Sequence, residues 1–203
     1  MISDIVKEKI ISDVKALFES QEGSHDWLHV YRVIKMAEEI GKTEKGSDST
    51  TVFLASILHD VADRKLQIRS LDWIKKYLVD LNIDKNIIEE VLFIVEHLSF
   101  SKQQNNPVSN KSIEFKIVQD ADRLDAIGAI GIARAFAFGG SKNRALYSDK
   151  EEDNDSTLHH FYQKLFKLED LMETIKGKEL AKERTAFMDH FVQTIKNECY
   201  LIK

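Results

Sequence analysis

The stretch Val52-Phe53-Leu54-Ala55-Ser56-Ile57-Leu58-His59-Asp60 decides the fold, because it is the most apolar run of the chain and ends in two ionisable residues. From Val52 to Leu58 the run is apolar on all sides. A strand is conceivable over so short a run, but its alanine and leucine content and its helical surroundings favour a buried helix. Burying His59 and Asp60 at the end of that helix is costly unless they are paired or bind a metal.

Helical spacing of apolar residues continues outward from this run in both directions. Stripes with intervals of three and four cover residues 5–18, 27–40, 71–81 and 87–98. Ser3, Ser70 and Asp84 stand where N-caps of three of these helices are expected, and Gly41 suits the end of the second. No alternation typical of strands appears. The sequence therefore predicts an all-α protein, a compact helical bundle.

The second half of the chain is expected to continue the bundle. The apolar-rich stretch 112–138 predicts helix that ends at Gly139-Gly140, and two last helices fit residues 161–175 and 178–202, separated by Gly177. Between them, residues 141–158 are polar and charged without apolar periodicity. A loop of this length inside a compact domain is usually a lid or disordered.

Length and composition favour one domain over the whole chain. The chain has 203 residues, of which 43% are hydrophobic and 31% are charged, enough for a sizeable core. We expect a single domain over residues 1–203. Its motif-bearing core spans about 23–140, and the C-terminal helices within 157–203 complete the bundle.

Charge and cysteine content limit the partners and the compartment. The 29 Lys and Arg against 34 Asp and Glu give a net charge of −5, which argues against a broad nucleic-acid-binding face. The single cysteine, Cys199, cannot form an intramolecular disulfide. The N-terminus lacks the pattern of a signal peptide, and no apolar run approaches the ~20 residues of a membrane span. We expect a soluble, cytoplasmic protein that does not bind membranes.

Four features place polar residues where helical core is interrupted. They are His25 and His29 one helical turn apart, the His59-Asp60 pair, Glu96-His97 at a helix end, and the aspartate-rich run 120–125, which includes Asp122. Each feature alone has an ordinary explanation as a cap, a solvated charge or a satisfied core residue. Together they bring four of the seven histidines beside carboxylates at helix ends. Imidazole and carboxylate donors without a thiolate suit a divalent cation such as Mn, Mg, Co, Ni, Fe or Zn.

These residues, taken in order, resemble the signature of the HD-domain superfamily of metal-dependent phosphohydrolases, in its small single-domain bacterial branch. The first motif is similar to residues 25–33, His25-Asp26-x-x-His29-x-x-Arg32-Val33. The second resembles residues 54–63, Leu54-Ala55-x-x-Leu58-His59-Asp60-x-x-Asp63. The last resembles residues 119–128, Gln119-Asp120-Ala121-Asp122-Arg123-Leu124-Asp125-Ala126-Ile127-Gly128. The resemblance covers residues 23–140 and implies a bundle of helices with a metal site.

Carried over position by position, the resemblance implies His29, His59, Asp60 and Asp122 as ligands of one divalent metal ion. Some branches hold a second metal with extra histidines, for which His97 is the one candidate here. One metal is therefore favoured. His25 stands outside the ligand set in this pattern and is expected to orient a ligand or meet the substrate.

The expected reaction is hydrolysis of a small phosphorylated substrate. A bound divalent ion lowers the pKa of its water and polarises a phosphoryl oxygen. Asp60 is expected to take part in catalysis as well as in metal binding, and Asp63 to act as a hydrogen-bond acceptor or general acid/base; a surface charge at a helix end is an equally good interpretation of Asp63. Lys65, Arg123 and His97 are candidate substrate contacts, although helix-end charges are usually only solvated.

Small members that resemble this chain are associated with nucleotides, so we expect a nucleoside triphosphate cleaved to monophosphate and pyrophosphate, or phosphomonoester cleavage. Two other functions stay open at this point. One is a diiron oxygenase on the same fold, and the other is a nucleotide sensor that binds metal without catalysis. The oligomeric state is also open, with a homodimer as one option.

Overall fold

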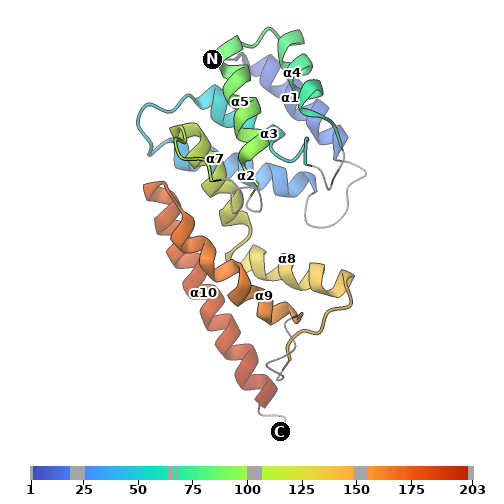
Figure 1. Ribbon diagram of the computed structural model, residues 1–203, viewed down its shortest axis with the longest axis vertical. Coiled ribbons are helices and arrows are strands. Elements are labelled where there is room, and N and C mark those ends of the chain that lie inside the picture. The colour runs from blue at the N-terminus through green and yellow to red at the C-terminus, as the bar shows by residue number, and fades with distance from the viewer. Residues whose placement is uncertain are drawn as a thin grey trace. The chain divides into compact units, whose positions relative to one another are not determined.

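The computed structural model describes residues 2–18, 26–63, 66, 68–99, 107–148 and 155–200. Within these ranges the chain forms helices joined by turns and contains no strand, which confirms the all-α prediction (Figure 1). The chain divides into two compact units, residues 1–121 and 122–203. The boundary falls inside helix α7 (Ile113–Asp125), so one continuous helix contributes to both units. The expectation of a single domain stays a prediction.

The N-terminal unit contains α1 (Asp4–Leu17), α2 (Trp27–Gly41), α3 (Ser49–Leu58), α4 (Leu71–Asp80), α5 (Lys85–His97) and most of α7. The three predicted N-caps are confirmed. Ser3, Ser70 and Asp84 each accept a hydrogen bond from a backbone N–H in the first turn of the helix that follows. Local side-chain chemistry therefore sets where α1, α4 and α5 begin.

Helix α3 is the centre of the N-terminal unit. Every residue from Thr50 to Leu58 is buried, and α3 packs against both α2 and α5 (Figure 1). Asp48 caps the helix, because its carboxylate accepts from the Thr51 backbone N–H at 2.7 Å. Each fully buried Leu, Ile, Val or Phe side chain contributes about 1.5–3 kcal/mol relative to exposure. The buried-helix interpretation of this run is correct, and the strand alternative is wrong.

The C-terminal unit contains the end of α7, then α8 (Gly128–Ser141), α9 (Thr157–Gln163), a short 3-10 helix η1 (Leu165–Leu171) and the long α10 (Ile175–Tyr200). Helix α10 packs against α8 and η1, and α8 packs against α9. Two predicted helix boundaries are wrong here. Gly139 and Gly140 lie inside α8, and Gly177 lies inside α10.

The glycines expected to end helices have other uses. Gly139 is buried, and a Cβ atom at its position would lie 2.1 Å from the Thr157 Oγ1 atom, so α8 and α9 approach too closely for any side chain there. The backbone N–H of Gly177 donates to Thr174 Oγ1 at 3.0 Å in the first turn of α10. The chain is interrupted earlier, at Lys164 between α9 and η1, where φ is −135°, and at Met172 between η1 and α10, where the backbone is extended.

The expected long polar loop is shorter than predicted, because α9 begins at Thr157 with Ser156 as its N-cap. The described ends of this segment are tied together. Backbone N–H groups of residues 157 and 158 donate to the carbonyls of residues 145 and 146 at 2.9 and 3.0 Å, and Arg144 pairs with Asp155 at 3.0 Å. Residues 149–154 lie outside the described residues, and a lid in this segment stays a prediction.

No helix among the described residues has both the length and the apolar character that crossing a membrane requires.

Candidate metal centre

His29 enters the site from the first turn of α2. The carboxylate of Asp26 caps this helix and accepts a hydrogen bond from the backbone N–H of His29 itself, at 2.8 Å. The cap fixes the helical turn that carries the imidazole. The His29 residue is 1% exposed, so its ring nitrogen faces protein rather than bulk water.

His59 lies at the C-terminal end of α3, whereas His29 lies near the N-terminal end of α2. Its Nδ1 lies 2.7 Å from the backbone carbonyl oxygen of Ser56. A carbonyl only accepts, so Nδ1 carries the proton and donates it. In the neutral ring, Nε2 therefore keeps its lone pair for a ligand. A metal-binding histidine is commonly fixed in this way through its other nitrogen.

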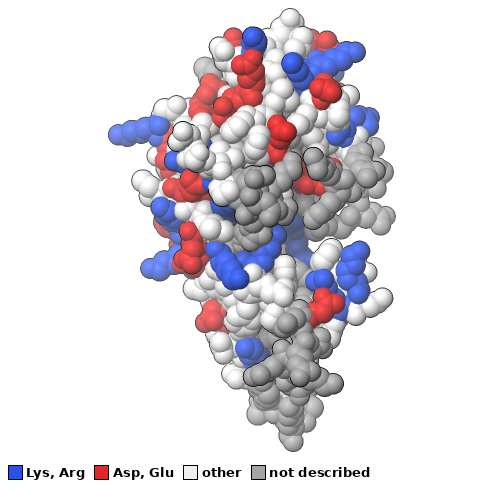
Figure 2. All heavy atoms as spheres, in the orientation of Figure 1, with Lys and Arg blue, Asp and Glu red and all other residues white. Residues whose placement is uncertain are grey.

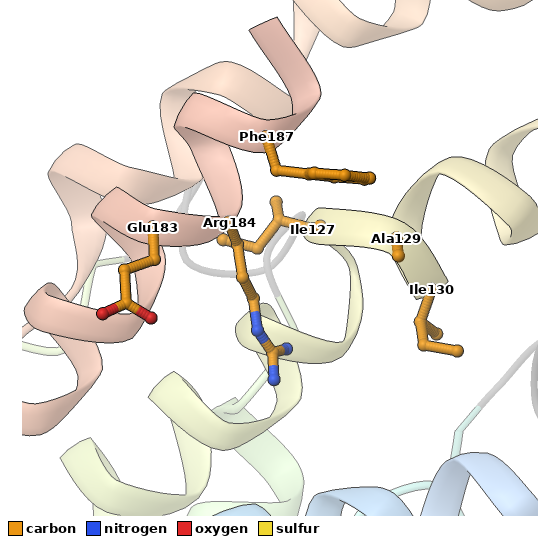
Figure 3. A pocket seen from close by; sticks show the side chains of 7 residues that line it. Ile127, Ala129, Ile130, Glu183, Arg184 and Phe187 are labelled. Carbon is orange, nitrogen blue, oxygen red and sulfur yellow. The ribbon is translucent and has the colours of Figure 1, made fainter. Parts of the chain in front are cut away.

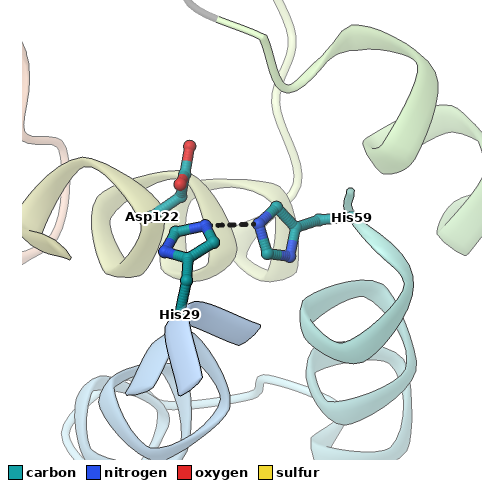
Figure 4. A group of neighbouring side chains, drawn as sticks. All are labelled: His29, His59 and Asp122. Atoms are coloured by element: carbon teal, nitrogen blue, oxygen red, sulfur yellow. Dashed lines mark hydrogen bonds between the residues drawn. The ribbon is translucent and has the colours of Figure 1, made fainter. Parts of the chain in front are cut away.

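The two imidazoles converge through their Nε2 atoms, which lie 3.2 Å apart (Figure 4). Asp60 follows His59 in the turn after α3, and its Oδ2 lies 3.4 Å from His29 Nε2 and 3.5 Å from His59 Nε2. Asp60 is itself buried, with 7% exposure. Two nitrogen donors and a carboxylate oxygen thus meet at one buried point of the N-terminal unit.

Asp122 joins this group from the last turn of α7. One donor atom from each of His29, His59 and Asp122 lies within 4.8 Å of the others (Figure 4). Asp60 Oδ2, at 3.4 and 3.5 Å from the two Nε2 atoms, meets the same histidine pair. Residues 29, 59 and 122 are far apart in sequence, and the fold brings their side chains together.

The donor set fits a divalent cation. Two ligand atoms that are each about 2.1 Å from one cation lie roughly 3.0–3.4 Å apart in octahedral or tetrahedral geometry, which brackets the observed 3.2 Å between the nitrogens. The hydrogen bond to Ser56 leaves the lone pair of His59 Nε2 directed at this point. Mixed imidazole and carboxylate ligands suit Mn, Fe, Co, Ni, Zn or Mg. His29, His59 and Asp122 therefore lie close enough to hold a metal ion.

The remaining predicted residues are distributed differently. Asp63 is half-buried one turn beyond Asp60, and its backbone N–H donates to the Asp60 carbonyl at 3.2 Å. His97, at the end of α5, donates from Nδ1 to the Phe93 carbonyl at 2.9 Å and packs its ring against the Phe93 ring. Arg123 is 8% exposed and donates to the backbone carbonyl of Leu171 at 2.6 Å.

His25 and Lys65 lie outside the described residues, so their predicted substrate contacts stay predictions. Those of His97 and Arg123 stay predictions as well, although the observed bond of Arg123 is to the protein's own backbone. The sequence interpretation missed two supports of the site. Asp26 was part of the first motif, and its position three residues before His29 is a typical N-cap signal. The Ser56 carbonyl is a backbone group that carries no sequence signal.

A helical fold that brings histidine and aspartate side chains together at one buried point defines a class of protein, the all-helical proteins with a candidate metal site. A family model described as HD domain matches residues 27–127 of the chain, a range that contains all three members of the donor group. The chain belongs to the HD-domain superfamily. The resemblance drawn from its three sequence motifs is therefore confirmed.

Particular relatives extend over nearly the whole chain. The uncharacterized protein YpgQ of Bacillus subtilis (strain 168) is 40% identical over 194 residues, which is 94% of this chain and 92% of that protein. The crystal structure of Bacillus subtilis YpgQ in complex with ADP superposes with a TM-score of 0.79 at 36% identity, covering 94% and 93% of the two chains. An HD-superfamily hydrolase from Bacillus thuringiensis has a TM-score of 0.81 at 38% identity, with 98% and 99% coverage.

Proposed function

We propose that the protein is a metal-dependent phosphohydrolase whose substrate is a nucleotide. The observation that carries the proposal is the convergence of His29, His59 and Asp60 with Asp122 at one buried point. Family membership supports the hydrolase class, and the donor set supports a divalent cation. The geometry favours one cation, because Asp60 and Asp122 both approach the same pair of imidazoles, His29 and His59, so that the donors of the described residues share one point.

The chain's own residues have distinct parts in this proposal. His29, His59, Asp60 and Asp122 hold the cation. When bound, the cation supplies an acidified water as nucleophile and polarises the phosphoryl oxygen. Asp60 has two carboxylate oxygens, so one oxygen accepts a proton or hydrogen bond while the other faces the imidazoles. Asp63, one turn further on, is the proposed general acid/base.

Burial of the histidine pair supports this chemistry. At 1% and 6% exposure, His29 and His59 exclude bulk water from one side of the site. Electrostatic interactions are stronger in such surroundings than in water, and fixed donors need little reorganisation during the reaction. The Asp26 cap and the Ser56 carbonyl supply that rigidity, because each fixes one of the two imidazoles.

A nucleotide is the proposed substrate because a relative that aligns over 94% of this chain has been crystallised with ADP. We propose cleavage of a nucleoside triphosphate to monophosphate and pyrophosphate, or of a phosphomonoester. Surface charge is consistent with a small ligand rather than a nucleic acid. Basic and acidic side chains are interspersed on the visible face of the N-terminal unit (Figure 2), and the net charge is −5.

The direct test is a release assay for phosphate and pyrophosphate over a panel of nucleotides, run in parallel with Mg, Mn, Co and Ni. We expect metal-dependent turnover in the unmodified protein and none in His59→Ala or Asp60→Asn. His190→Ala is the matched control, because it removes an exposed histidine from α10 and is expected to leave turnover unchanged.

Two outcomes would contradict the proposal. Nucleotide binding without turnover under every metal would indicate a sensor. Two irons per chain after anaerobic purification, without phosphate release, would indicate an oxygenase.

A further inference from the structure

Asp122 stands on the least secure part of a helix. It lies one turn from the C-terminal end of α7, where helices tend to fray; here the backbone N–H groups of Ala126 and Ile127 donate to the carbonyls of Arg123 and Leu124 at 3.1 and 3.3 Å. A frayed last turn would move the Asp122 carboxylate away from His29 and His59. Whatever anchors this turn therefore affects how well the three donors are held together.

Arginine side chains from two other helices anchor this turn. Arg184 of α10 donates to the backbone carbonyl of Leu124. Arg134 of α8 donates to the backbone carbonyl of Asp125 at 3.1 Å and pairs with the Asp125 carboxylate at 2.6 Å. Cations at a helix C-terminus also interact favourably with its partial negative charge.

The surroundings of the two arginines indicate a built contact rather than a chance one. The Asp125 carboxylate is 6% exposed, so its pair with Arg134 is shielded from water. Burial lowers the pKa of Arg184, while the charge of Asp125 acts in the opposite direction. Asp125 is therefore the acidic partner close to both guanidinium groups.

Gly128 makes room for Arg184. Its φ is +76°, and a Cβ atom there would lie 3.0 Å from Arg184 Cγ, so the aliphatic stem of Arg184 passes directly over the glycine. The stem borders a cavity of about 320 Å³, lined by residues 127–130 and by Glu183, Arg184 and Phe187 (Figure 3). Two residues of the last motif beyond Asp122 therefore have a structural part. Asp125 pairs with Arg134, and Gly128 leaves space for the side chain of Arg184.

We propose that Arg134 and Arg184 are positioning residues for the metal site, which hold the last turn of α7 so that Asp122 keeps its place among the donors. The inference rests on the proposed metal centre. Neither arginine needs to touch metal or substrate. Each acts through the backbone that carries Asp122, and α8 and α10 thereby contribute to the affinity for the cation.

The test is a titration of the apo protein with Co²⁺, followed by calorimetry and by the visible absorption of the bound ion, which reports its ligand geometry. Arg184→Met keeps the aliphatic stem over Gly128 and removes the guanidinium. Arg134→Met removes the guanidinium of the arginine in α8 and keeps an unbranched side chain there. We expect either variant to weaken Co²⁺ binding about tenfold, as removal of groups that orient a metal ligand commonly does, and to change the absorption bands. Arg184→Lys is expected to restore part of the affinity.

The matched control is Thr174→Ala, which removes the hydroxyl that accepts from Gly177 at the start of α10 and so destabilises the helix that carries Arg184. It is expected to lower Tm without altering the Co²⁺ spectrum. The inference is overturned if both Met variants bind Co²⁺ with unchanged affinity and spectrum, or if Thr174→Ala weakens binding equally. Failure of the unmodified protein to bind Co²⁺ would instead remove the metal centre itself.

Discussion

Replacement of Gly139 by alanine is expected to destabilise the protein, although alanine is the better helix former. Gly139 lies inside α8, where Gly→Ala on its own contributes about 1 kcal/mol of stability. The new Cβ would, however, lie 2.1 Å from Thr157 Oγ1 and 3.3 Å from Thr157 Cβ. Thr157 is 2% exposed and β-branched, so it cannot turn aside easily.

Overpacking of this kind costs about 1–3 kcal/mol, and a clash this short belongs in the upper part of that range. After the helix gain of about 1 kcal/mol is subtracted, the net loss in free energy of unfolding is about 1–2 kcal/mol. In a chain of this size, that net loss lowers Tm by about 2–8 °C. Thermal unfolding followed by circular dichroism at 222 nm measures the change. The double variant Gly139→Ala/Thr157→Ala removes the clashing hydroxyl and is expected to recover most of the loss.

Gly140 is the matched control, because it is the next residue in the same helix and a Cβ atom there meets nothing within 4 Å. Gly140→Ala is expected to raise the free energy of unfolding by about 0.5–1 kcal/mol. Opposite signs at the two neighbouring positions would support the structure. If both variants were destabilising, the pair would end the helix after all, and if both were stabilising, the close approach of α8 and α9 would be refuted.

Three further predictions concern caps, ionisable groups and the cation. Asp26→Ala is expected to lower the free energy of unfolding by about 1 kcal/mol and to weaken metal binding, because the cap of α2 holds the His29 backbone N–H; Asp26→Ser should retain both, and calorimetric metal titration separates the variants. Tyr77 donates to Asp13 at 2.7 Å. Burial, together with this bond, raises the pKa of Tyr77, while the bonds from Lys9 and Tyr77 lower the pKa of Asp13. A raised tyrosine pKa gives stability that is present below about pH 10 and lost above it, and a lowered aspartate pKa gives stability that is lost as pH falls below about 4. The difference in free energy of unfolding between the unmodified protein and Tyr77→Phe should therefore be largest between these limits. A difference that stays constant from about pH 3 to 11 in urea titrations would contradict the assignment. Mn²⁺ at about 100 times its Kd is expected to stabilise the apo protein by about 2.7 kcal/mol. Scanning calorimetry with and without a chelator measures this stabilisation, and equal Tm values in the two scans would contradict the prediction.

Much of the N-terminal unit could be predicted from the sequence because its signals are local. Caps such as Ser70 and Asp84 act on the turn that follows them, and the run from Val52 to Leu58 can only be stable where every side is covered. The histidine and aspartate motifs were recognisable for the same reason, since each occupies a few consecutive residues. Their order along the chain identified the family.

The C-terminal unit was harder to predict, because its boundaries depend on contacts between distant residues. Gly139 resembles a helix stop in sequence, yet its smallness serves the approach of Thr157, which lies 18 residues further along the chain. The anchoring of α7 by Arg184 likewise joins residues 60 positions apart. Periodicity within one segment carries no information about such pairs, and so neither the true ends of α8 and α10 nor the role of Arg184 was apparent.

The most direct measurement of the central claim is the number of divalent ions bound per chain, determined by equilibrium dialysis and elemental analysis for the unmodified protein and for His59→Ala. The convergence of His29, His59, Asp60 and Asp122 predicts one ion per chain in the unmodified protein and none in the variant, with helical content retained in both. Equal metal content in the two proteins would contradict the account, because the cation would then be held without the imidazole that the fold places at the site.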